Sequence, residues 1–165
     1  MTTVALLWEP GLAPTDPLFD AAVAHVVRKL GRAKPIAADS LPSERGALIR
    51  ALDDWADGAV DWRGELRRYC EAHIPVHVRP RAGVNATLRR LHAAGIRLVW
   101  AAQGPPESTR VLLHHLGVAR LVEETAYGPT PEAAVAALGA EAEGAVIVRG
   151  LEDLLALAEQ TAVAT

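Results

Sequence analysis

The chain has 165 residues, half of them hydrophobic, and a formal net charge of −3. These values predict a globular protein with a sizeable core and exclude a disordered chain. The charged residues form no basic stripe, so nucleic-acid binding is not expected, and no apolar run reaches the roughly 20 residues that span a bilayer. The single cysteine, Cys70, excludes an internal disulfide, and the N-terminus lacks a secretory-signal pattern. We therefore expect a cytoplasmic protein that does not bind membranes.

Apolar runs predict four β-strands, and a fifth segment is a weaker candidate. The first strand is expected over residues 4–7, and the second over 97–102, before a Gln-Gly-Pro-Pro segment that breaks regular structure. A third is expected over 121–127 and a fourth over 144–148, where β-branched residues gather. The C-terminal residues 161–165 are a candidate for a short edge strand.

Helical patterns separate these strands. We expect helices over residues 85–94, 107–116, 131–138 and 152–159, and the first three are followed by or end near glycine. From residue 83 onward helices and strands therefore alternate. This alternation predicts an α/β fold of three layers, with a Rossmann-like parallel sheet between helices.

The stretch between the first strand and this alternating region is expected to be entirely helical. Its three predicted helices cover residues 16–30, 43–55 and 62–73, and no segment has the pattern of a strand. The order of elements thus predicts a small helical insertion after the first strand.

Several short motifs follow one another along the chain. They are Arg-Pro-x-x-Gly at 79–83, Ala-Gly-Ile-Arg-Leu at 94–98, Leu-His-His-Leu-Gly-Val at 113–118, Gly-Pro-Thr-Pro at 128–131, and an apolar strand followed by Asp153 at 145–153. With the helical insertion, this order resembles that of the haloacid dehalogenase-like (HAD) hydrolases over nearly the whole chain. The resemblance implies an α/β core domain of residues 1–14 and 79–165, with a helical cap domain at 15–78.

The positions that carry catalysis in that family hold other residues here. Gap-free alignment places Trp8 at the nucleophilic aspartate, Pro10 at the acid–base aspartate, Ala102 at the hydroxyl, Gly128 at the lysine, Arg149 at the first late acid and Asp153 at the second. An aspartyl intermediate needs a carboxylate, and proline cannot exchange a proton. The family's Mg²⁺ needs carboxylate oxygens, which leaves Asp153 alone among the expected ligands. We therefore expect no cofactor, no metal and no standard catalytic residue.

Two residues at the end of the first strand leave alternatives open. Glu9 is either a displaced nucleophile or a solvent-facing or ion-paired side chain, and strand alternation, which points it opposite to Trp8 and Pro10, favours the latter. Trp8 is a plug for the pocket, a surface for a flat ligand or partner, or a residue packed against the inserted helices.

Other candidate sites have simpler explanations. Arg149 and Asp153 are spaced for a salt bridge or a helix cap, with an anion site as the alternative. Gln103 is either a ligand donor or part of a turn. Cys70, His73 and His77 have the spacing of metal ligands, but a fourth ligand is missing and Pro75 is expected to interrupt the helix that would present them.

The sequence therefore favours a catalytically inactive HAD-like protein that works as a binding, regulatory or scaffolding module. The alternative is an atypical phosphatase or dehalogenase that uses Glu9 or Asp153. A third reading is a structural partner or homo-oligomer subunit, for which an apolar patch around Trp55, Trp62 and Tyr69 would provide a surface. The candidate contacts of the degenerate pocket are Trp8, Glu9, Pro10, Ala102, Gln103, Gly128, Arg149 and Asp153.

Overall fold

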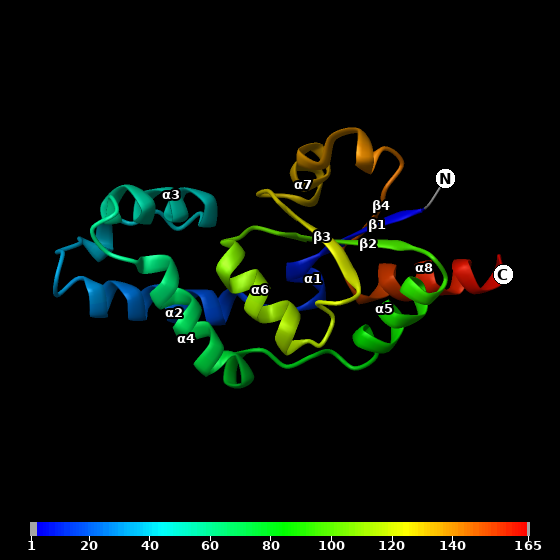
Figure 1. The fold of residues 1–165 in the computed structure, drawn as a ribbon, viewed down its shortest axis with the longest axis horizontal. Coiled ribbons are helices and arrows are strands. Elements are labelled where there is room, and N and C mark those ends of the chain that lie inside the picture. The colour runs from blue at the N-terminus through cyan, green and yellow to red at the C-terminus, as the bar shows by residue number, and fades with distance from the viewer. Residues whose placement is uncertain (1–2, 165) are drawn as a thin grey trace.

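The structure, a computed structural model, describes residues 3–164 and contains a parallel sheet of four strands in the order β3-β2-β1-β4. Figure 1 shows this sheet at the centre of the molecule. The strands are β1 (Val4–Trp8), β2 (Arg97–Ala102), β3 (Val122–Tyr127) and β4 (Val146–Val148). Each of the four predicted strands is present, and the parallel pairing confirms the α/β prediction.

Helices cover both faces of the sheet and make the layered arrangement expected from the alternation. One face carries α7 (Pro131–Leu138), which is followed by the short η2 (Gly139–Ala142). The other carries α5 (Val84–Ala93), α6 (Pro106–His115) and α8 (Leu151–Val163). These helices lie on opposite sides of the strands in Figure 1.

Strand alternation divides the core between the two faces. Leu6 points toward α7 in a small cluster that includes Ala134, whereas Leu7 points toward the larger cluster beneath the sheet. Because β1 is paired on both sides, its apolar residues from Val4 to Leu7 are all buried.

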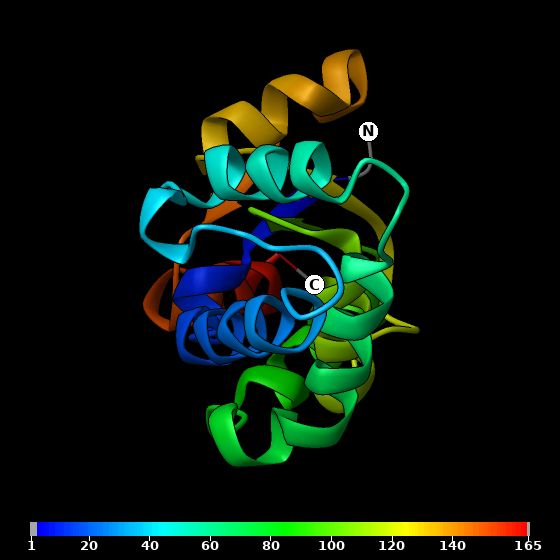
Figure 2. The ribbon, with the colours of Figure 1, turned by 90° about the vertical axis from the view of Figure 1, so that its left-hand side faces the viewer.

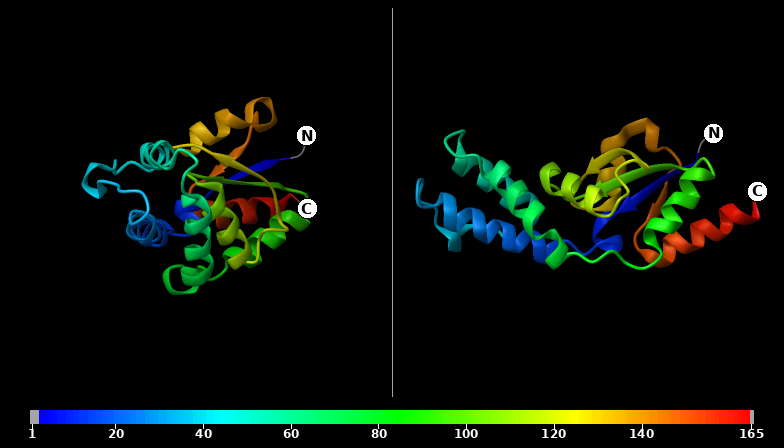
Figure 3. Two further views of the ribbon diagram at one scale, coloured as in Figure 1. Left: turned by 60° about the vertical axis from the view of Figure 1, so that its left-hand side comes forward. Right: turned by 60° about the horizontal axis from the view of Figure 1, so that its bottom comes forward.

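The inserted segment consists of helices that extend from the carboxyl end of the sheet. The tiny helix α1 (Glu9–Leu12) follows β1, and then come α2 (Asp16–Leu30), η1 (Ala38–Ser40), α3 (Arg45–Ala56) and α4 (Trp62–His77). Figure 2 looks onto this end of the molecule, where α2 and α3 lie one above the other. Both views in Figure 3 show the insertion projecting beyond the sheet.

Two sequence predictions about regular structure are wrong. Residues 161–163 continue α8 instead of forming an edge strand, because Ala158 and Thr161 extend the face that meets Leu91 of α5; residue 165 lies outside the described part. Helix α4 also continues through Pro75 to His77. Pro75 is exposed, and the buried Ile74 and Val78 on either side are joined by a backbone hydrogen bond of 2.8 Å.

Between residues 3 and 164, the helices are too short or too polar to cross a membrane.

Candidate functional site

The four loops after the parallel strands meet at one edge of the sheet, next to the inserted helices. In open parallel sheets this edge is where ligands bind. Its loops are residues 9–13 after β1, 103–105 after β2, 128–130 after β3 and 149–150 after β4.

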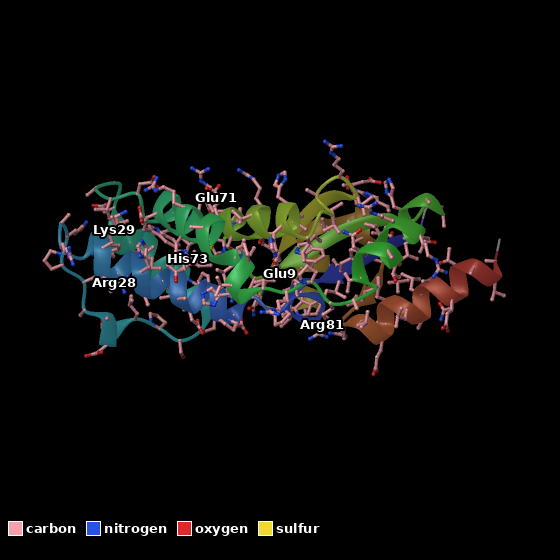
Figure 4. All side chains as sticks on the ribbon, turned by 90° about the horizontal axis from the view of Figure 1, so that it is seen from below. Glu9, Arg28, Lys29, Glu71, His73 and Arg81 are labelled. Atoms are coloured by element: carbon pink, nitrogen blue, oxygen red, sulfur yellow. The ribbon has the colours of Figure 1, made fainter. Side chains whose placement is uncertain are left out.

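Glu9 is the only carboxylate of the first loop, and it points inward. It is 3 % exposed. Its Oε1 accepts a hydrogen bond from the indole Nε1 of Trp100 at 3.1 Å, and its Oε2 accepts one from Thr15 Oγ1 at 3.3 Å. The expectation of a solvent-facing Glu9 is therefore wrong. Glu9 does point opposite to Trp8, as strand alternation predicts, but this direction leads to Trp100 in the core and not to solvent. Figure 4 places Glu9 in the middle of the molecule.

Burial also sets the ionisation of Glu9. Loss of water raises the pKa of this carboxyl, although the hydrogen bond from Trp100, the nearby charge of Arg45 and the hydrogen bond from Thr15 oppose the rise. A buried carboxyl with both oxygens occupied and a raised pKa is a poor nucleophile.

Arg45 joins the insertion to this edge, although it was not among the predicted site residues. Its side chain is 8 % exposed and donates to Asp16 Oδ1 at 2.5 Å and to the carbonyl of Gly104 at 3.5 Å. The guanidinium also lies over the ring of Phe19, 4.1 Å from the centroid. One signal was available: Arg45 continues the buried face of α3 formed by Leu48 and Leu52.

Trp8 lies on the other face of the sheet. It is partly buried against the cluster that includes Ala134 and Val135 of α7. Of the alternatives for Trp8, packing is observed, but against α7 and not against the inserted helices. Trp100, by contrast, is fully buried.

The loops after β1 and β4 touch through their backbones. A Cβ on Gly11 would lie 1.5 Å from the carbonyl oxygen of Arg149, so only glycine fits there. The Arg149 side chain forms an ion pair with Glu132 of α7, and its backbone N–H donates to Asp153 Oδ2 at 2.8 Å. Of the alternatives for this pair, no side-chain salt bridge is present; Asp153 instead accepts from the backbone of Arg149, the residue before the N-cap Gly150 of α8.

The loops after β2 and β3 are joined in a similar way. The N–H of Gly128 donates to the carbonyl of Ala102 at 3.1 Å, and Gln103 Nε2 donates to the carbonyl of Pro129 at 3.2 Å. A Cβ on Gly128 would lie 2.7 Å from the backbone nitrogen of Ala134, so a lysine does not fit here without a shift of α7.

An open cleft remains between the insertion and the core. Its volume is about 640 Å³. Two predicted residues, Gln103 and Gly128, line it, whereas Trp8, Glu9, Pro10, Ala102, Arg149 and Asp153 do not. The other lining residues were not predicted: Glu44, Gly46, Ile49, Arg50, Arg63, Gly104, Pro105, Pro106, Tyr127 and Pro129.

Of the three charged side chains that line the cleft, two already have hydrogen-bond partners. Arg63 makes two hydrogen bonds to Asp53, at 2.9 and 3.0 Å, and one to Glu107 at 3.2 Å, which raises its pKa. The Glu44 carboxylate accepts from the N–H groups of Ala47 and Gly46 at the start of α3, which lowers its pKa. The Arg50 side chain forms no hydrogen bond with another residue of the described range 3–164, so its donors are open to a ligand.

The acids at the sheet edge do not fit the Mg²⁺ that the family resemblance implies. Both oxygens of Glu9 are taken by Trp100 and Thr15, which leaves the exposed Asp153 as a single carboxylate. Elsewhere in residues 3–164, no three His, Cys, Asp or Glu side chains are grouped to hold a metal ion. Cys70 is buried, which raises the pKa of its thiol to about 11, and the His73 ring pairs with the carbonyl of Tyr69.

The expected patch of Trp55, Trp62 and Tyr69 does not form. Trp62 is buried and donates to Asp53, and Trp55 donates to the carbonyl of Pro35. Tyr69 instead stacks on His73, with ring centroids 4.0 Å apart.

Comparison with known proteins identifies the fold. No protein-family model matches the sequence, and no curated protein matches it. Among solved structures, CbbY from Rhodobacter sphaeroides in complex with phosphate is 19% identical, with a TM-score of 0.61 over 98% of this chain and 84% of that one. A haloacid dehalogenase-like family hydrolase from Streptococcus pneumoniae is 13% identical, with a TM-score of 0.54 over 98% and 81%. The chain therefore has the fold of the haloacid dehalogenase-like hydrolases.

Proposed function

We propose that this protein is a HAD-fold module that binds a ligand in the cleft between insertion and core and does not hydrolyse it through an aspartyl intermediate. The observation that carries the proposal is the closed environment of Glu9. This sole acid of the first loop is buried, and its two oxygens are occupied by Trp100 and Thr15.

The cleft supports the binding half of the proposal. Ile49, Tyr127 and the nearby prolines give it apolar walls, and Arg50 adds a cation. Concave sites with apolar walls and few polar groups are typical of small-molecule binding.

An activity assay tests the catalytic half. Phosphatase and dehalogenase substrates are supplied with Mg²⁺ to the wild-type protein and to Glu9→Gln and Asp153→Asn. We expect no turnover above a protein-free control. Turnover that either substitution abolishes would instead establish the alternative of an atypical hydrolase.

Thermal unfolding tests the metal and the ligand separately. Millimolar Mg²⁺ is expected to leave the melting temperature unchanged, and a clear rise would contradict the inactive site. A ligand found by thermal-shift screening should lose its effect in Ile49→Glu, whereas the matched exposed substitution Val76→Glu should retain it. Equal responses of the two variants would exclude the cleft as the binding site.

A further inference from the structure

A second cavity lies between α4 of the insertion and α6 of the core. The two helices run side by side, and the ion pair of Arg63 with Glu107 joins them at the cleft. The second cavity begins one turn further along both helices and has a volume of about 460 Å³. Its lining residues are Arg67, Glu71, Ile74, Pro75, Arg110, Val111, His114 and His115, which we call the α4–α6 groove.

Positively charged and imidazole groups outnumber carboxylates in this groove. Arg110 and His114 are four residues apart on α6, so they share a face of the helix. Both are exposed, and their side chains form no hydrogen bond or ion pair with any other described residue. Among the described residues that line the groove, the one carboxylate is Glu71, which pairs with Arg67 at 3.3 Å while both side chains remain about half exposed. On their other side, Arg110 and His114 border a hollow that is lined by Glu123 and Glu124.

The base of the groove is apolar. Ile74 is buried beneath it, Val111 is partly buried beside it, and Pro75 lies exposed at its edge. His115 adds little polarity, because its Nε2 pairs with the carbonyl of Val78 at 3.1 Å. A ligand that fits both parts has an apolar body and an anionic group.

We propose that the α4–α6 groove binds a small anion with an apolar body, such as an aryl phosphate or aryl carboxylate. The apolar ring lies over Ile74 and Val111, and the anion accepts hydrogen bonds from Arg110 and His114. Glu71 faces the same space and weakens binding by repulsion. The site is independent of the function proposed for the cleft, since the two cavities share no lining residue.

Titration of the isotope-labelled full chain with phenylphosphonate, followed by NMR, tests the proposal. This probe has a ring and a phosphonate but no bond for a phosphatase to cleave. We expect saturable shifts of the backbone amides in residues 67–74 and 110–115. Inorganic phosphate, which lacks the ring, should bind more weakly at the same residues.

Matched substitutions separate a specific site from general attraction. Arg110→Gln should weaken phenylphosphonate binding about tenfold, because one charge-assisted hydrogen bond is lost. Arg120→Gln removes the same charge from an exposed arginine outside the groove and should leave the affinity within about twofold. Glu71→Gln should strengthen binding.

Three outcomes would overturn the proposal. They are shifts that do not saturate, shifts confined to the cleft around Tyr127, and equal losses in Arg110→Gln and Arg120→Gln. Shifts confined to the cleft would at the same time support the function proposed for it, so the two proposals fail independently.

Discussion

Two glutamates with nearly the same exposed fraction behave in opposite ways in the core and in the insertion. Glu9, at the end of β1, is 3 % exposed, and Glu65, on α4, is 4 % exposed. Burial raises the pKa of Glu9, whose direct partners are the neutral Trp100 and Thr15. Glu65 accepts hydrogen bonds from Lys29, His25 and Arg68, and these lower its pKa to about 2.

Glu9 lies deep in the core, where loss of water dominates its pKa, whereas Glu65 is covered mainly by charged partners that themselves reach solvent, such as Lys29 and Arg68. In the insertion, the charge of Glu65 holds α2 to α4, because Lys29 and His25 belong to α2. In the core, Glu9 meets no such cluster, so its environment favours the neutral form. The carboxyl at the end of β1 is therefore harder to ionise than a free glutamate.

The largest expected effect comes from disturbing the backbone contact between the loops after β1 and β4. Gly11→Ala forces a Cβ against the carbonyl of Arg149, which requires a backbone shift. We expect the free energy of unfolding in urea to fall by about 3 kcal/mol. In the control, Gly150→Ala, the new Cβ finds its nearest neighbour 3.7 Å away, so a much smaller loss is expected. Equal losses would show that the contact does not seal the loop.

The next effect concerns the charged cluster of the insertion. Glu65→Gln leaves three cationic or imidazole partners without their carboxylate, and we expect a loss of about 2 kcal/mol at pH 7. Because the folded-state pKa of Glu65 is depressed, its stabilisation is full above the unfolded value of about 4.3 and declines as pH falls toward 2. Urea unfolding of both proteins between pH 2 and 7 should show the difference shrink. A constant difference would contradict the role of charge.

Glu9→Gln is expected to raise the free energy of unfolding, whereas the two substitutions above lower it. The amide oxygen still accepts from Trp100, and the cost of ionising a buried carboxyl disappears. We expect the free energy of unfolding to rise by about 1 kcal/mol at pH 7. Because the pKa of Glu9 is raised in the folded state, the wild-type protein loses stability as pH rises from about 4.3 through that pKa, so the gain should vanish below pH 4. A loss of stability at pH 7 would mean that Glu9 is held as a carboxylate.

The smallest effect is predicted for an exposed glutamate on the same helix as Glu65. Glu71→Gln removes the ion pair with Arg67, in which both side chains are about half exposed. Such pairs contribute about 0.3 kcal/mol. A loss in urea as large as that of Glu65→Gln would show that burial is unimportant for these pairs.

Much of the fold could be predicted because local signals and tertiary packing agree. The buried strands are short apolar runs, and glycines such as Gly117, with φ of 69°, follow the helices. The prediction failed at the C-terminus, where composition alone suggested a strand but the helical face of α8 packs on α5. It also failed at Pro75. The helix α4 accommodates this proline because Pro75 lies at an exposed position.

The site was harder to predict because its contacts join distant segments. Sequence order identified the loops that carry Gln103 and Gly128, but it could not show that Arg45 from α3 reaches Asp16 and Gly104. The burial of Glu9 was missed because its side chain, which points opposite to Trp8 as expected, meets Trp100 of the neighbouring strand. A buried polar residue on an otherwise apolar helix face, such as Arg45, is the signal that would have pointed toward the site.

The hydrogen bond from Trp100 to Glu9 gives the protein an internal optical probe. Trp100 is fully buried, and its indole donates directly to the carboxyl whose charge is in question. We therefore expect the fluorescence of this residue to respond to the proton on Glu9, and replacing Trp8, Trp55 and Trp62 with phenylalanine would isolate it. The protonation state of the sheet edge could then be followed in solution without a label or a substrate.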